Sequence, residues 1–215
     1  MSFDGVIFDF DGTLADTSEG VIESVEYALR KVGSPSFPRE TLKGFIGPSL
    51  FISFQRITGL SPENAERAVE YYRETYSREG IFKLKLYDGM RELLGELKER
   101  GVKLSVASAK PQVSLDVVVE FLRLDGTFDR VVGPSLAVKS DDKKELVAAA
   151  KLTENSVMVG DAVFDIRAAK AVGASSIAAL YGFGDRRALI DEKPDFTAEN
   201  VADLKKILLE RERDF

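Results

Sequence analysis

The chain has 215 residues, 44% of them hydrophobic, and carries a formal net charge of −6 at pH 7. It contains no histidine, cysteine or tryptophan, which excludes disulfides, zinc sites built on thiolate or imidazole, and Ser-His or Cys-His nucleophilic pairs. The acidic charge argues against a nucleic-acid partner, and no apolar run approaches the roughly 20 residues that span a bilayer. Because the amino terminus also lacks the basic stretch of a signal peptide, we expect a cytoplasmic protein with no membrane partner.

The first predicted element is a strand that ends in two carboxylates. Residues 3–8 are apolar, β-branched or aromatic, which is typical of a buried strand, and D-F-D-G-T follows at residues 9–13. Side chains at positions i and i+2 of a strand point the same way, so Asp9 and Asp11 are expected to converge where open α/β sheets bind ligands. Two carboxylates there are costly unless a cation such as Mg²⁺ shares the site. The alternative, a surface turn, is disfavoured because a hydrophobic strand leads into it.

A helical block follows this strand. The spacing of apolar residues, with no convincing strand between Thr17 and Ile81, predicts helices at residues 19–32, 39–45, 50–58 and 62–79. Ser61 is expected to cap the last of these helices, with Pro62 at its first position. We expect residues 16–85 to form an α-helical cap domain, inserted into a core made of residues 1–15 and 86–215.

Beyond Tyr87, strands and helices alternate. The expected strands lie at residues 102–107, 130–132, 157–159 and 176–180. The expected helices lie at residues 90–100, 112–122, 144–151, 165–172 and 201–213. Such alternation implies parallel pairing, so the predicted fold class is α/β with a doubly wound parallel sheet.

Two later segments place a hydroxyl and a lysine at the same edge of the sheet. Ser108-Ala109-Lys110 follows a strand, and a hydroxyl with exposed N–H groups at such a turn binds anionic oxygens, although a serine there is more often an ordinary cap. Asp141-Asp142-Lys143-Lys144 precedes the helix at 144–151. The acidic pair suits a helix N-terminus, whereas the lysines oppose the helix dipole, so at least one of them has another reason to be there. Two surface lysines are the simpler alternative.

A third segment repeats the pattern of the first strand. The apolar run 157–159 leads into G-D-A-V-F-D at residues 160–165. This places Asp161 at the end of a strand and Asp165 four residues later. Capping of the next helix explains one of these carboxylates but not easily both.

Together these segments predict one site, in which Asp9, Asp11 and Asp161 surround Mg²⁺ and are faced by Ser108 and Lys143. A carboxylate nucleophile, a metal and a Lys/Ser pair that binds phosphate oxygens are typical of phosphoryl transfer. In this interpretation Asp9 attacks phosphorus and becomes an aspartyl phosphate. Asp11 protonates the leaving alkoxide and then activates the water that hydrolyses the intermediate.

The order of these motifs resembles the haloacid dehalogenase-type superfamily over nearly the whole chain. The helical block, and L-Y-G-F-G at residues 180–184, resemble its phosphoglycolate phosphatase-like branch. The resemblance implies a Rossmann-like core, a metal bound by the backbone carbonyl of Asp11, and an Asp165 that holds the metal site or Lys143. Two departures stand out, because Ala162 replaces the frequent basic or polar residue after G-D, and no proline follows the lysine. The phosphate-binding lysine is therefore Lys143 or Lys144, and we favour Lys143.

The expected partner is a small phosphorylated metabolite. A closing cap would shield the aspartyl phosphate, and the loop from Lys43 to Pro48, with Lys43 and Gly47 as candidates, would contact the substrate. Such a lid favours small esters, such as phosphoglycolate or a nucleoside monophosphate, over polymers. The phosphate group itself is expected to contact Gly12, Thr13, Ser108, Ala109 and Lys143.

Other functions stay open at this point. A phosphomutase of the β-phosphoglucomutase type passes the phosphoryl group to a sugar rather than to water, and an inorganic pyrophosphatase is also possible. A receiver-type phosphoacceptor protein in signalling also uses an Asp cluster, a Ser/Thr and a Lys, but its acceptor lies on a middle strand and it has no helical insert of this size. A non-catalytic phosphate-binding protein is disfavoured because every proposed catalytic group is present. We expect a monomer or a weak homodimer.

Overall fold

A computed structural model describes residues 3–137 and 142–210 of the chain. Its centre is a six-stranded sheet in the order β5-β4-β1-β6-β7-β8, in which every neighbouring pair is parallel. The strands are β1 (Gly5–Phe8), β4 (Lys103–Ala107), β5 (Arg130–Val132), β6 (Ser156–Gly160), β7 (Ser175–Ala179) and β8 (Phe196–Ala198). The predicted α/β class with a doubly wound parallel sheet is confirmed.

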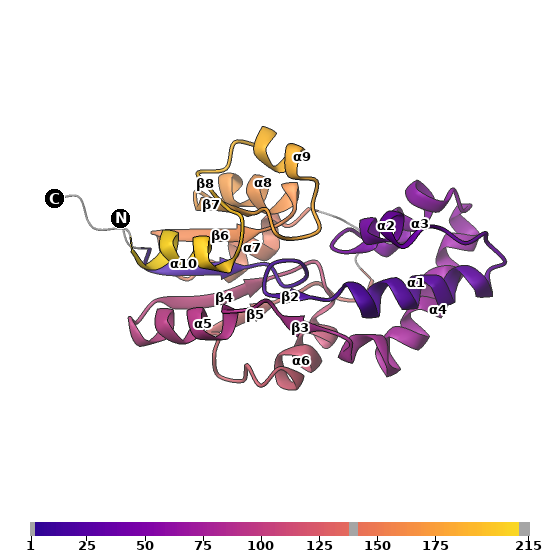
Figure 1. The fold of residues 1–215 in the computed structure, drawn as a ribbon, viewed down its shortest axis with the longest axis horizontal. Helices are drawn as coiled ribbons and strands as arrows, with labels where there is room; N and C mark the ends of the chain where they lie inside the picture. The colour runs from indigo at the N-terminus through magenta and orange to yellow at the C-terminus, as the bar shows by residue number, and fades with distance from the viewer. Residues whose placement is uncertain (1–2, 138–141, 211–215) are drawn as a thin grey trace.

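Helices cover both faces of this sheet (Figure 1). Because successive side chains of a strand point to opposite faces, Val6 and Phe8 of β1 join the larger hydrophobic core, whereas Ile7 joins a second core. The helices on the first face are α5 (Met90–Glu99), α6 (Gln112–Phe121) and α10 (Val201–Leu209), and those on the second are α7 (Lys144–Ala150) and α8 (Val163–Ala171). The two faces are therefore packed independently on one sheet.

Two short elements near the C-terminus were not predicted. Helix α9 (Arg186–Asp191) begins after Asp185, whose Oδ1 accepts a hydrogen bond from the Ala188 N–H at 2.7 Å. Strand β8 is a three-residue edge strand paired with β7. Elements this short carry too few residues for periodicity to show in the sequence. The predicted end of the last helix, at residue 213, lies outside the described residues.

The remaining helices form a group at one end of the molecule, beyond the carboxyl ends of the strands (Figure 1). They are α1 (Ser18–Lys31), α2 (Arg39–Leu42), α3 (Leu50–Thr58) and α4 (Pro62–Arg78), with the 3-10 turns η1 (Lys43–Phe45) and η2 (Gly80–Phe82). Helices thus occur at all four predicted positions, and the Ser61 hydroxyl caps α4 by accepting from the Asn64 N–H at 3.3 Å. In the described part of the chain, no helix is both long and apolar enough to cross a membrane.

A short antiparallel ladder lies where the chain passes between the sheet and the helical group. It joins β2 (Ala15–Asp16) to β3 (Lys85–Leu86), and neither strand was predicted. The ladder spans the predicted boundaries of the cap, between residues 15 and 16 and between residues 85 and 86. The division into two domains stays a prediction, and below the name cap denotes residues 16–85.

Candidate active site

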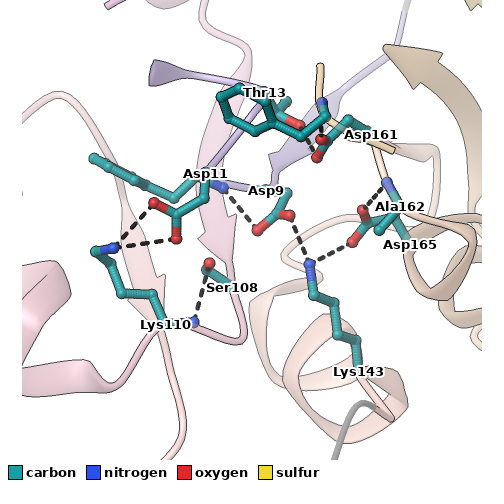
Figure 2. Close-up of polar contacts among 11 residues, drawn as sticks. Asp9, Asp11, Thr13, Ser108, Lys110, Lys143, Asp161, Ala162 and Asp165 are labelled. Carbon is teal, nitrogen blue, oxygen red and sulfur yellow. Dashed lines mark hydrogen bonds and ion pairs between the residues drawn. The ribbon is translucent and has the colours of Figure 1, made fainter. Parts of the chain in front are cut away.

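The carboxyl ends of three neighbouring strands meet at one place. Strand β1 lies between β4 and β6, and all three are in register. The next residues along the chain are Asp9 after β1, Ser108 after β4 and Asp161 after β6, so the topology brings these three together (Figure 2). The Asp9 N–H donates to the carbonyl of Val159 at 2.9 Å, which fixes the start of the turn against β6.

A buried lysine bridges two of the site's carboxylates. Lys143 Nζ lies 2.7 Å from Asp9 Oδ2 and 2.8 Å from Asp165 Oδ1, and no residue of the three is more than 3% exposed (Figure 2). Burial opposes the charge on the Lys143 ammonium, but Asp165 and Asp9 outweigh it and raise the pKa of Lys143. Lys143 is therefore a cation at neutral pH. Lys144, the alternative phosphate-binding residue, is exposed.

Asp165 also closes the first turn of α8. Its Oδ2 accepts a hydrogen bond from the Ala162 N–H at 3.0 Å, while its other oxygen accepts from Lys143. Capping thus accounts for one of the two carboxylates of this segment, as expected. Of the acidic pair before α7, Asp142 Oδ1 accepts from the Lys144 N–H at 2.9 Å, and Asp141 lies outside the described residues.

Asp161 is held from two sides of the site. Its Oδ1 accepts from the Thr13 hydroxyl at 3.3 Å, and its Oδ2 accepts from the Phe183 N–H at 2.8 Å. Gly12 makes this approach possible, since a Cβ there would lie 2.2 Å from Asp161 Oδ2. Burial, and then the charges of Asp9 and Asp165, raise the pKa of Asp161 above its ordinary range.

The buried carboxylates form a site whose donors fit Mg²⁺. One oxygen from each of Asp9, Asp161 and Asp165 lies within 4.8 Å of the other two. One ammonium, that of Lys143, offsets only part of their negative charge. A small divalent cation that prefers carboxylate oxygens suits both the charge and the donor set. This side-chain cluster contains Asp165 where the sequence led us to expect Asp11.

The carboxylate of Asp11 points away from that cluster. Both of its oxygens accept from Lys110 Nζ, at 3.0 and 3.1 Å, and Lys110 also donates to the hydroxyl of Tyr76 at 2.8 Å (Figure 2). The expected convergence with Asp9 rested on strand alternation, but β1 ends at Phe8 and Asp11 lies in the turn beyond it. The Asp11 carboxylate is thus not part of the side-chain cluster of Asp9, Asp161 and Asp165, and its place beside the metal stays a prediction.

Lys110 and Tyr76 are polar groups of the site that the sequence analysis did not single out. Burial opposes the charge on Lys110, but Asp11 and Tyr76 outweigh it and raise the pKa of Lys110. Burial also raises the pKa of Tyr76, so its phenol stays neutral and can accept from Lys110. Lys110 stands two residues after Ser108 in a segment already assigned to the site, which was the one available signal. Tyr76 had none, because it lies at ordinary helical spacing in α4.

The predicted phosphate-binding residues lie around Asp9. Ser108 is 2% exposed, and in Figure 2 its hydroxyl faces the space between Asp9 and Asp11. The Ser108 hydroxyl accepts from the Lys110 N–H at 3.3 Å, and Ala109 lies in the turn between them. Gly12 and Thr13 reach the same place through their contacts with Asp161. All the predicted phosphate-binding residues therefore come from loops at one edge of the sheet.

Two cavities, called inner and outer here by their distance from Asp11, are lined by residues of both the cap and this edge of the sheet and share several of those residues. The inner cavity, of about 110 Å³, is lined by Asp11, Lys110, Tyr76 and Gly47 among others, and the outer one measures about 390 Å³. Gly47, one of the two cap candidates, thus faces the inner cavity. Lys43, the other candidate, does not line either of these cavities and instead pairs with Glu40 at 2.7 Å.

The family follows from comparison with known proteins. A model of the haloacid dehalogenase-like hydrolase family matches residues 6–179. Among solved structures, a predicted phosphatase from Clostridium acetobutylicum superimposes with a TM-score of 0.90 at 34% identity, over 98% of this chain and 100% of that one. The chain belongs to the haloacid dehalogenase-like hydrolase family and is an enzyme of its phosphatase class.

Curated relatives span several phosphate chemistries. A 5'-nucleotidase from Pseudomonas aeruginosa is 32% identical, over 97% of this chain and 96% of the relative. The tyrosine-protein kinase PtkA from Mycobacterium tuberculosis is 31% identical, over 94% of this chain and 70% of the relative. A phosphoglycolate phosphatase from Pseudomonas savastanoi is 27% identical, over 94% of this chain and 78% of the relative. The resemblance to a phosphoglycolate phosphatase-like branch is confirmed.

Proposed function

We propose that the enzyme is a Mg²⁺-dependent phosphatase that hydrolyses small phosphate monoesters through an aspartyl phosphate on Asp9. The observation that carries this proposal is the environment of Asp9. Its carboxylate is 2% exposed, stands at the carboxyl end of the central strand, and is paired with the cation Lys143. A buried carboxylate held next to a fixed cation and further carboxylates suits a nucleophile for phosphorus.

The metal would be held by Asp9 and Asp161, together with the backbone carbonyl of Asp11 that the family resemblance implies. When bound, Mg²⁺ would offset the charge of the carboxylates and of the phosphate oxygens. Asp165 would keep Lys143 in place, because its two oxygens are already engaged with Lys143 and the Ala162 N–H.

The reaction would proceed in two displacements. An oxygen of Asp9 forms a bond to phosphorus while the bond from phosphorus to the ester oxygen breaks, and Asp11 gives its proton to the departing alkoxide. Water then attacks the aspartyl phosphate and gives a proton to Asp11, which releases inorganic phosphate and restores the Asp9 carboxylate. Lys143 and Ser108, with the backbone around Gly12, Thr13 and Ala109, would bind the phosphate oxygens.

The substrate would be a phosphoglycolate-like ester or a nucleoside monophosphate. The inner cavity beside Asp11 accepts a small leaving group, and the outer cavity leaves room for a larger one. The activities named for the nucleotidase and phosphoglycolate phosphatase relatives support the same range. The cap would close over the site and keep out water that is not positioned for attack.

Release of inorganic phosphate, with and without Mg²⁺, tests this function. The panel is phosphoglycolate, AMP, a sugar phosphate, pyrophosphate and 4-nitrophenyl phosphate, and Asp9→Asn is compared with wild type. We expect Mg²⁺-dependent release from at least one monoester, and its loss in Asp9→Asn. Asp125→Asn, which changes an exposed carboxylate, should retain activity. Full activity in Asp9→Asn would contradict the assignment of the nucleophile, and release from pyrophosphate alone would contradict a monoesterase.

A further inference from the structure

One cation links the cap to the catalytic edge of the sheet. The ammonium of Lys110 contacts both carboxylate oxygens of Asp11, at 3.0 and 3.1 Å, and the hydroxyl of Tyr76, at 2.8 Å. Asp11 and Lys110 follow strands of the sheet, whereas Tyr76 lies in the last turn of α4. Each of the three residues is at most 8% exposed. A buried chain of three side chains therefore joins α4 to the carboxylate that acts as acid in the proposed function.

We propose that Tyr76 is a positioning residue for Asp11 and acts through Lys110. In this arrangement the cap contributes to catalysis by holding the acid that protonates the leaving group, in addition to covering the substrate. The inference rests on the proposed function, since it takes Asp11 to be the general acid.

The position of Asp11 depends on Lys110. Asp11 lies beyond the end of β1, so strand geometry does not set the direction of its side chain. Among the described residues, the hydrogen bonds of its carboxylate all come from Lys110. If Lys110 moves, the Asp11 carboxylate is left without a fixed partner.

The donors of Lys110 are already used. A lysine ammonium has three N–H donors, and here the two oxygens of Asp11 and the hydroxyl of Tyr76 provide three acceptors. No donor is left over for a substrate oxygen, so the geometry points to a holding role for Lys110. Loss of the Tyr76 hydroxyl would free one donor and allow the ammonium to shift.

The acid held in this way faces the place of the leaving group. Asp11, Lys110 and Tyr76 all line the inner cavity of about 110 Å³. Asp11 thus borders the space in which the ester oxygen of a leaving group would lie. The chain of contacts thus ends at the carboxyl group that, once protonated, would supply the proton for the first displacement.

Helix α4 is itself anchored to the core at a second point. Arg73, one turn before Tyr76, donates to the carbonyl of Leu136 at 2.8 Å, in the segment after β5. The two contacts set the position of this end of α4 relative to the sheet. The position of the Tyr76 hydroxyl is therefore set by how α4 packs against the core.

Two tyrosine variants test the inference on two kinds of ester. Tyr76→Phe keeps the ring and removes only the hydroxyl. The control is Tyr71→Phe, because Tyr71 lies in the same helix, is partly buried against the hydrophobic core and lines neither cavity. For each variant, kcat/KM is measured for an alkyl phosphate (phosphoglycolate or AMP, whichever wild type hydrolyses faster) and for 4-nitrophenyl phosphate.

The two esters differ in their need for the acid. An alkoxide requires a proton to leave, whereas 4-nitrophenolate leaves without one, and kcat/KM reports the first displacement. We expect Tyr76→Phe to lower kcat/KM about tenfold for the alkyl ester and less than about twofold for the aryl ester. Tyr71→Phe should leave the ratio of the two values at that of wild type. Equal losses on both esters, or no loss in Tyr76→Phe, would overturn the inference.

A crystal structure of Tyr76→Phe separates this inference from the proposed function. We expect the Asp11 carboxylate to leave the position it has on Lys110, and an unchanged Asp11–Lys110 pair would overturn the inference whatever the activity. The proposed function is judged separately by Asp9→Asn. Full turnover in Asp9→Asn would contradict the assignment of Asp9 as the nucleophile. Unchanged ester selectivity in Tyr76→Phe would contradict only the positioning role of Tyr76.

Discussion

At the scale of single residues, the balance of buried charge around Asp9 is the main electrostatic feature. Asp9, Asp161 and Asp165 are at most 5% exposed, and Lys143 is the cation that contacts two of them directly. A charge removed from water is tolerated only where an opposite charge and hydrogen bonds replace the lost hydration. Lys143 thus stabilises these buried carboxylates, and in the proposed function it would also bind a phosphate oxygen of the substrate.

Substitution of the two adjacent lysines distinguishes their roles. Lys143→Met should lower kcat/KM by about 10²-fold or more, because it removes a fixed cation from the site, whereas the exposed Lys144→Met should change it less than about twofold. Both values come from phosphate release at saturating Mg²⁺, with circular dichroism to confirm folding. A larger loss in Lys144→Met than in Lys143→Met would contradict the assignment of Lys143.

At the scale of elements, the turn after β1, which carries Asp9, lies against the loop after β6. Gly12 has φ = +79°, its N–H donates to the carbonyl of Ala15 at 2.9 Å, and a Cβ there would lie 2.2 Å from Asp161 Oδ2. An L-residue is strained at this φ and would also displace Asp161. The glycine is therefore required both by the turn and by the site.

A pair of glycine substitutions separates the backbone strain at a positive φ from the clash of a new Cβ with Asp161. Gly12→Ala should destabilise the fold by about 1–3 kcal/mol and strongly lower kcat/KM, because the new Cβ displaces Asp161. Gly33, after α1, also has a positive φ, but a Cβ there meets nothing within 4 Å. Gly33→Ala should cost only about 1 kcal/mol and leave kcat/KM unchanged. Urea denaturation and phosphate release measure both variants, and full activity in Gly12→Ala would contradict this view of the turn.

At the scale of the whole molecule, one sheet topology gathers groups that are distant in sequence. Parallel strands β1, β4 and β6 end together, so Asp9, Ser108 and Asp161 meet although up to 152 positions separate them. The chain leaves the core through β2 and returns through β3, which leaves the cap over that same edge (Figure 1). In the proposed role of Tyr76, catalysis then depends on how the cap packs against the sheet, where Tyr76 accepts a hydrogen bond from Lys110.

The parts of the fold that could be predicted are those with a local signal. Apolar strands that end in Asp9, Ser108 or Asp161 reveal both the parallel sheet and its polar edge. The two-residue strands β2 and β3 carry no such periodicity, and they pair because the chain enters and leaves the cap side by side there.

The contacts of Asp11 lacked a local signal. Its direction depends on the last hydrogen-bonded residue of β1, Phe8, and sequence patterns locate such boundaries only to within a few residues. The bond between Tyr76 and Lys110 joins positions 34 residues apart, and it depends on which turn of α4 faces the sheet. Packing between elements decides that, and no pattern within α4 alone reveals it.

The central claim is that Asp9 itself carries the phosphoryl group, and rapid acid quench during turnover tests it most directly. Wild-type enzyme with Mg²⁺ and its best substrate is quenched, digested and examined by mass spectrometry, with Asp9→Asn as the control. We predict a peptide containing Asp9 that is heavier by one phosphoryl group and labile to base, and no such peptide from Asp9→Asn. A phosphoryl group on another residue would contradict the claim. So would turnover without any phosphorylated enzyme in single-turnover experiments that resolve the first displacement.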